Sequence, residues 1–118
     1  MSDGREIRER VFRFACDVVA LHDVLVTRGV SARDMSRQLM RAATSIGANL
    51  EEADAGQSRA DFISKCSISL KEAREALYWL RLLRATGKLD AHGDALIHEC
   101  DRIVAVITTI VRKTKGDG

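Results

Sequence analysis

The chain contains no proline in its 118 residues, and only 4% of them are aromatic. Turns in β-rich domains usually contain proline, and β-strands favour aromatic and β-branched residues, so this composition favours an all-helical protein. No apolar run approaches the roughly 20 residues that a membrane-spanning helix needs, and residues 1–10 lack the apolar stretch of a signal peptide. We therefore expect a cytoplasmic protein that does not enter a membrane.

Cysteine and net charge are also low. The three cysteines are an odd number, and their wide spacing without a C-x-x-C pair argues against both a disulfide framework and a zinc site. The formal net charge is only +2, and 46% of the residues are apolar, which excludes an intrinsically disordered chain. The length suits one domain over residues 1–118.

Glycines divide the chain into four segments of similar length. Gly29, Gly56 and Gly87 each stand where an apolar period stops, as a left-handed residue at a helix end does. Candidate N-cap residues precede three of the segments: Ser31, Ser58 and Asp90. These signals predict helices near residues 5–28, 32–55, 59–86 and 91–114.

Each segment repeats apolar residues at alternating spacings of three and four. This spacing is typical of a helix that packs nearly parallel to its neighbours. In the first segment the repeat consists of Ile7, Val11, Phe14, Val18, Leu21 and Leu25. Short connections between long helices favour antiparallel neighbours, so we predict an all-α, up-down-up-down antiparallel four-helix bundle.

Two segments carry apolar residues beyond this repeat. By the helical angle of about 100° per residue, they form a second stripe on each segment. The stripes consist of Phe12, Ala15, Val19 and Val26 in the first segment and Ile68, Trp79 and Leu82 in the third. Surplus apolar surface often marks a protein interface, so we predict self-association. The alternative is that each helix turns to bury a wider face.

The second segment combines small residues with a polar stripe. Gly47 stands in the middle of the predicted helix, where it costs roughly 1 kcal/mol against alanine unless another backbone element approaches closely. The stripe beside it consists of Gln38, Arg41, Ser45, Asn49 and Glu52. We interpret the stripe as a hydrogen-bonded network that fixes helix or subunit register. The alternative is a contact surface for a ligand or a nucleic acid.

Three stretches resemble a known family: RVFRFACDV at 10–18, QLMRAATSIGANLEEADAGQSRADFISKC at 38–66 and LKEAREALYWLRLL at 70–83. They resemble the 23S rRNA intervening-sequence family, four-helix bundles encoded within bacterial large-subunit rRNA genes and as free-standing genes. That family is similar to the accessory variability determinant of diversity-generating retroelements, a bundle that partners a reverse transcriptase and binds nucleic acid. The resemblance implies an antiparallel bundle that assembles as a homopentameric ring, and it implies no catalytic residues.

The resemblance and the surplus stripe together give a set of candidate interface or register residues. They are Gln38, Arg41, Ser45, Gly47, Asn49, Glu52, Ile68, Glu72, Tyr78, Trp79 and Leu82. We expect the protein to bind further copies of itself, and the resemblance adds a protein partner such as a reverse transcriptase. We expect Trp79 to anchor an interface, because buried tryptophans often dominate the energy of association.

Positive charge is concentrated in residues 58–88, which hold seven basic and three acidic residues, a net of +4. A basic stripe within about 80° of the helix consists of Arg74, Arg81, Arg84 and Lys88. Repeated around a ring, these side chains would form a circle of positive charge that engages the phosphates of RNA or DNA. The alternative is a solvated face whose cations pair with nearby acids.

Signals of enzymatic chemistry are lacking. The sequence has no Glu-x-x-His pair of a di-iron bundle and no glycine-rich loop that could hold a phosphate. Cys66 and Cys100 fall on the apolar repeats, where buried cysteines are inert. We therefore predict a protein without enzymatic activity, cofactor or metal. Two functions remain: a homo-oligomeric interaction module, or a nucleic-acid-binding ring.

Overall fold

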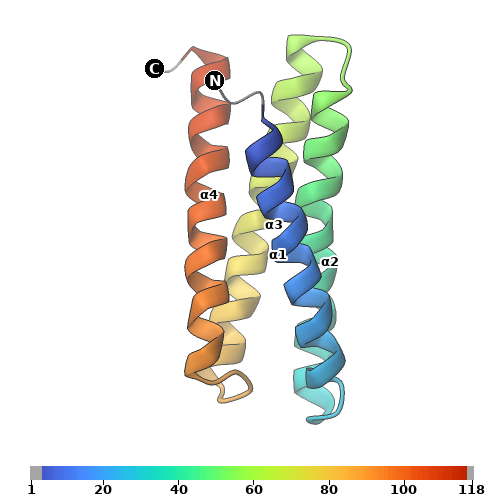
Figure 1. Cartoon of the computed structure of the whole chain (residues 1–118), viewed down its shortest axis with the longest axis vertical. Coiled ribbons are helices and arrows are strands. Elements are labelled where there is room, and N and C mark those ends of the chain that lie inside the picture. The colour runs from blue at the N-terminus through green and yellow to red at the C-terminus, as the bar shows by residue number, and fades with distance from the viewer. Residues whose placement is uncertain (1–3, 117–118) are drawn as a thin grey trace.

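The computed structural model describes residues 4–116. Its elements are α1 (Arg5–Leu25), α2 (Val30–Asp54), α3 (Arg59–Ala85), the short 3-10 helix η1 (Ala91–Gly93) and α4 (Asp94–Lys115). The described residues include no strand. The four long helices run alternately in opposite directions, so that both ends of the described chain lie at the same end of the molecule (Figure 1). The predicted all-α, up-down-up-down bundle is confirmed, with each helix end within three residues of its predicted position.

Side-chain caps stand where two of the connections end. The Ser58 hydroxyl accepts a hydrogen bond from the backbone N–H of Asp61 at 3.0 Å, so the predicted N-cap of α3 is confirmed. Asp90 accepts from the backbone N–H of His92 at 2.9 Å. Asp90 therefore caps η1, which leads into α4, rather than α4 itself.

The glycines end the helices in different ways. Gly87 has a φ of +77° just after the end of α3, and only glycine adopts this left-handed conformation without strain. Gly29 is the N-cap of α2, which begins at Val30. The predicted cap Ser31 is therefore wrong, because it already lies inside the first turn. Gly56 is not left-handed, because α2 ends in a tightened turn in which Gly56 donates to a carbonyl three residues earlier.

The predicted apolar repeats meet in one core. In α1, every member of the repeat is buried except Leu21, which is half-buried. Two polar side chains are also fully buried, and both are hydrogen-bonded: Ser69 donates to the Ile46 carbonyl at 2.9 Å, and Ser36 lies 2.7 Å from Nδ1 of His22. Buried polar groups with partners cost little stability, so these serines are compatible with a well-packed core.

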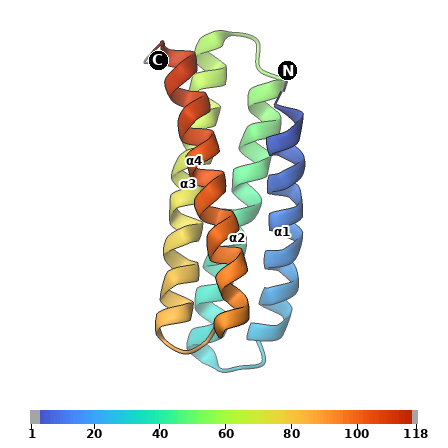
Figure 2. The same cartoon turned by 60° about the vertical axis from the view of Figure 1, so that its left-hand side comes forward.

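The four helices are not packed equally closely. The contact between α2 and α3 is the most extensive and that between α1 and α4 the least. The bundle measures 45 × 23 × 20 Å (Figures 1 and 2).

A Cβ atom on Gly47 would lie 3.3 Å from Cγ1 of Val11, which is tighter than an ordinary contact. Packing at Gly47 is therefore tight, but the neighbour is a side chain of α1 and not another backbone element as predicted.

Candidate functional site

The polar stripe of α2 lies against α3 and forms a network with it. The guanidinium of Arg41 lies 3.4 Å from the Glu72 carboxylate and also hydrogen-bonds Glu75. The Ser45 hydroxyl donates to Glu72 at 3.3 Å, and Gln38 lies beside Arg41 at 3.5 Å. The predicted network therefore links two helices of the same chain and fixes how α2 and α3 lie along each other.

The same network continues toward the end of α2. The Asn49 amide donates to the backbone carbonyl of Ser45 at 2.9 Å and to its hydroxyl at 3.1 Å. Nζ of Lys65 on α3 lies 3.0 Å from Glu52. All five residues of the predicted stripe thus take part in polar contacts, although Gln38 and Asn49 bond only within α2.

Trp79 and Tyr78 extend this surface on α3. The Trp79 indole N–H donates to Glu75 at 3.3 Å, and its ring packs half-buried against the core. Although burial opposes it, the hydrogen bonds from Arg41 and Trp79 hold the pKa of Glu75 below its ordinary value. Tyr78 lies edge-on to Trp79, with ring centroids 5.4 Å apart, and is 58% exposed. Of these two aromatic side chains, Tyr78 is therefore the more accessible to another molecule.

The surplus apolar stripes are only partly buried by the bundle. On α3, Leu82 is half-buried like Trp79, whereas Ile68 is exposed. On α1, Phe12 is 70% exposed and Val19 is 40% exposed. Rotation of the helix thus accounts for part of the stripe on α3 but not for the stripe on α1. Within the described residues, α4 has no large exposed apolar side chain, and α2 has only its first residue, Val30.

Fewer cations of the predicted basic stripe on α3 are without a partner in the chain than the sequence predicts. Nε of Arg84 lies 2.9 Å from Asp94, and that hydrogen bond raises the pKa of the guanidinium. Lys88 is half-buried and donates to the Thr86 carbonyl at 3.3 Å. Arg74 and Arg81 are exposed and form no ion pair in residues 4–116. Two of the four predicted cations are therefore held by their own chain, and two face solvent.

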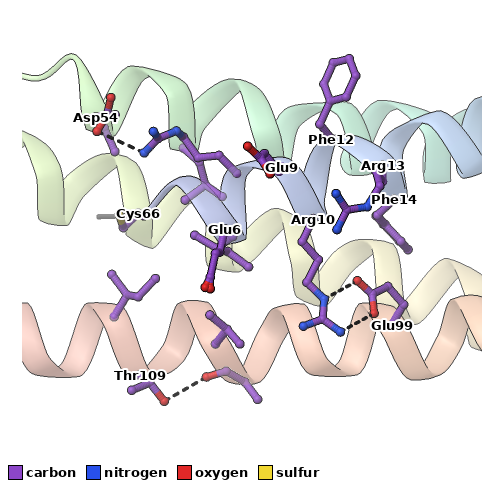
Figure 3. A pocket seen from close by; sticks show the side chains of 18 of the residues that line it. Glu6, Glu9, Arg10, Phe12, Arg13, Phe14, Asp54, Cys66, Glu99 and Thr109 are labelled. Carbon is purple, nitrogen blue, oxygen red and sulfur yellow. Dashed lines mark hydrogen bonds and ion pairs between the residues drawn. The ribbon is translucent and has the colours of Figure 1, made fainter. Parts of the chain in front are cut away.

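A groove of about 1450 Å³ runs between α1 and α4 (Figure 3). Ile7, Cys66 and Ile110 are among its apolar lining residues. Arg10 on α1 spans it to Glu99 on α4 through two hydrogen bonds of 2.5 and 2.8 Å. The hydrogen bond from Arg10 lowers the pKa of Glu99. The sequence analysis missed this pair, because 89 residues separate its members and neither belongs to a periodic stripe.

Two of the three cysteines, Cys66 and Cys100, are buried in the core, whereas Cys16 is exposed. Burial raises the pKa of Cys100 to about 12 and also raises the pKa of Cys66, which disfavours the nucleophilic thiolate. In the part of the chain that the structure describes, no group of three or more His, Cys, Asp or Glu residues could hold a metal ion. No helix there has the length and apolarity required to cross a membrane.

These features define an all-α four-helix bundle in which a polar network joins α2 to α3 and large apolar side chains are exposed mainly on α1 and α3. The chain belongs to the 23S rRNA-intervening sequence protein family, which matches residues 5–109. The resemblance seen in the sequence is confirmed. A solved structure from Bacteroides thetaiotaomicron, a protein of unknown function from the S23 ribosomal protein family, is 35% identical with a TM-score of 0.86. The similarity covers 94% of this chain and 99% of that one.

No curated protein sequence matches the chain. The family description and the Bacteroides structure name no enzymatic activity.

Proposed function

We propose that the protein is a non-enzymatic scaffold that assembles with copies of itself into a closed ring. The observation that carries the proposal is the exposure of large apolar side chains along α1 and α3, above all Phe12 on α1 and Tyr78 on α3. Leaving an aromatic side chain in water forgoes the roughly 1.5–3 kcal/mol that its burial contributes, and a partner surface recovers this free energy. Five subunits is the number that the family resemblance implies.

The mass of the full-length protein in solution tests the proposal. Sedimentation equilibrium at micromolar concentration should give about five times the chain mass of 13.0 kDa. A protein that stays at 13.0 kDa would overturn the scaffold proposal, and a stable dimer would overturn the ring. Dilution should shift the mass in a concentration-dependent way, because association follows mass action.

A second candidate function is the binding of RNA or DNA. The observation that favours it is the pair Arg74 and Arg81, two exposed cations seven residues apart on the same side of α3, neither with an ion pair in the described residues. Binding through phosphates should weaken steeply as salt rises, because counterions are released on association. This function is compatible with a ring, which would repeat the two cations around its circumference.

Fluorescence anisotropy of labelled RNA and DNA, measured between low and physiological salt, tests this second function. The double variant Arg74→Glu with Arg81→Glu should abolish binding while the oligomer mass is unchanged. The matched control is Arg33→Glu with Arg37→Glu, since both of these cations already pair with Asp34 at 3.6 and 3.5 Å. Absence of binding even at low salt would eliminate the function.

A further inference from the structure

We infer that the copies join head to tail, with the α1 surface of one copy packed against the α3 surface of the next. The α1 surface consists of Glu9, Phe12 and Val19, and the α3 surface consists of Ile68, Lys71 and Tyr78. The occupant of each surface is therefore a second copy of this chain. The inference rests on the proposed ring, because it names the two surfaces through which the ring would close.

The position of the two helices in the bundle is the first argument. α2 lies close to both α1 and α3, and α4 lies close to both as well, whereas the backbones of α1 and α3 nowhere come as close to each other among the described residues. α1 and α3 therefore stand diagonally across the bundle (Figures 1 and 2). Their outer surfaces face away from each other, so one copy can hold a different neighbour on each surface.

This arrangement decides the symmetry of the assembly. A contact between identical patches closes after two copies and produces a dimer. A contact between two different patches leaves one patch free on each end, so growth continues and gives a ring where the rotation closes and an open filament where it does not. Two distinct apolar surfaces on diagonal helices thus favour a ring over an isologous dimer.

Matching spacing along the two helices is the second argument. Glu9, Phe12 and Val19 follow one another at three and seven residues, and so do Ile68, Lys71 and Tyr78. At 100° per residue each set spans about 80° of its helix. α1 and α3 run in the same direction (Figure 1), as two helices of neighbouring copies do when the bundles stand upright in a ring. The two helices can therefore lie parallel to each other in the contact, with the three residues of the α1 surface opposite the three residues of the α3 surface.

Charge and chemistry of the two surfaces are the third argument. Glu9 and Lys71 are both exposed, and neither forms an ion pair within residues 4–116. In the parallel contact the Lys71 ammonium meets the Glu9 carboxylate and the ring of Phe12, a combination of ion pair and cation–π contact. Val19 then lies opposite the ring of Tyr78. The α1 surface thus supplies a carboxylate and an aromatic ring, and the α3 surface supplies the ammonium group that interacts with both.

A mixing experiment with full-length variants tests the inference. Phe12→Glu disables only the α1 surface, and Tyr78→Glu disables only the α3 surface. Each variant alone should sediment at 13.0 kDa, because no copy then finds an intact complement. An equimolar mixture should form a heterodimer of twice that mass and nothing larger, since one intact surface remains on each partner. A mixture that stays monomeric, or either single variant at the wild-type mass, would overturn the inference.

The control is Val30→Glu, which changes a 65% exposed valine at the start of α2, outside both surfaces. It should keep the wild-type mass. Far-UV circular dichroism checks that each variant is folded, and Val19→Glu with Ile68→Glu forms a second mixing pair should either first variant unfold. A wild-type protein that is itself monomeric contradicts the proposed function, whereas an oligomer that Phe12→Glu does not disturb contradicts only this inference.

Charge reversal gives an independent measurement of the same contact. Glu9→Lys places two cations opposite each other and should weaken each subunit contact by up to about fivefold, the upper end of the range for an exposed ion pair. Adding Lys71→Glu to Glu9→Lys restores opposite charges and should recover most of that loss. Equal weakening in the single and the double variant would show that these two side chains do not meet.

Discussion

The two sides of the bundle are built differently. On the α2–α3 side, Arg41 bridges two carboxylates of α3, and the buried Ser69 bonds the backbone of α2. On the α1–α4 side, an open groove of about 1450 Å³ is spanned by Arg10 and Glu99. The comparison shows that α2 and α3 form a tightly joined pair, against which α1 and α4 pack as separate elements.

Side-chain size explains this difference. Both helices of the tight pair carry fully buried alanines: Ala42 and Ala43 on α2, and Ala73 and Ala76 on α3. Small side chains let two helix axes approach more closely, which increases the number of atoms in van der Waals contact. α4 instead presents branched residues such as Val106 and Ile110 to the groove, and these hold it farther from α1.

The largest expected difference between the two sides lies in the cost of a cavity. Leu80 on α3 is fully buried, and Leu80→Ala should reduce the free energy of unfolding by about 3 kcal/mol. Ile110→Ala removes a half-buried side chain beside an existing groove and should cost about 1 kcal/mol. Urea denaturation of both variants measures the difference. Equal losses would contradict the view that the α1–α4 side is loosely packed.

An intermediate effect is expected where α1 approaches α2. Gly47→Leu places a side chain where even a Cβ lies 3.3 Å from Val11, and overpacking of this kind should cost about 2 kcal/mol of unfolding free energy. Adding Val11→Ala should return part of the loss by making room. Ala48→Leu, at an exposed position next in the chain, is the control and should leave stability nearly unchanged. A fully stable Gly47→Leu protein would exclude tight packing at this point.

The smallest effect concerns the ion pair across the groove. A double-mutant cycle of Arg10→Ala and Glu99→Ala should give a coupling free energy of about 1 kcal/mol. Because the folded state lowers the pKa of Glu99, the pair contributes fully above the ordinary glutamate pKa of about 4.3. Its contribution is lost as the pH falls through the lower pKa of the folded state.

Glu99→Gln supplies the matched test of this ion pair. The substitution should remove the contribution of this ion pair to the pH dependence of the unfolding free energy, which urea denaturation between pH 7 and pH 3 measures. Hydrogen exchange should become faster in α1 while the α2–α3 pair stays protected. Faster exchange in α2 and α3 to the same extent would mean that the two sides are not separable.

Helix positions could be predicted from the sequence because their signals are local. The spacing of Ile7, Val11 and Phe14 identifies a buried face within one helix. The Ser58 cap is equally local, since its partner stands three residues away. Ser31 shows the limit: it has the same capping pattern, but Gly29 turns the chain early enough for α2 to start before it. The conformation of the preceding turn decides which residue becomes the cap.

The site could be predicted only in part, for a related reason. The polar stripe around Arg41 is visible in the spacing of one helix, but its acceptors, Glu72 and Glu75, come from another. Which residues meet across two helices depends on how far each helix is rotated about its axis, and periodicity leaves that rotation open by tens of degrees. The pairing of Arg84 with Asp94, which gives a predicted cation a partner within the chain, could not be predicted from the sequence for the same reason.

The alternating direction of the helices also has a consequence for folding kinetics. Each of the three closely packed helix pairs is consecutive in the chain, so its contacts close only a short loop and cost little chain entropy. The one pair distant in sequence, α1 with α4, is also the one with the sparsest contacts. The mean sequence separation of contacts is therefore small, and proteins of this kind fold within about microseconds to milliseconds. A chain of this design can therefore complete its fold without waiting for contacts between distant segments.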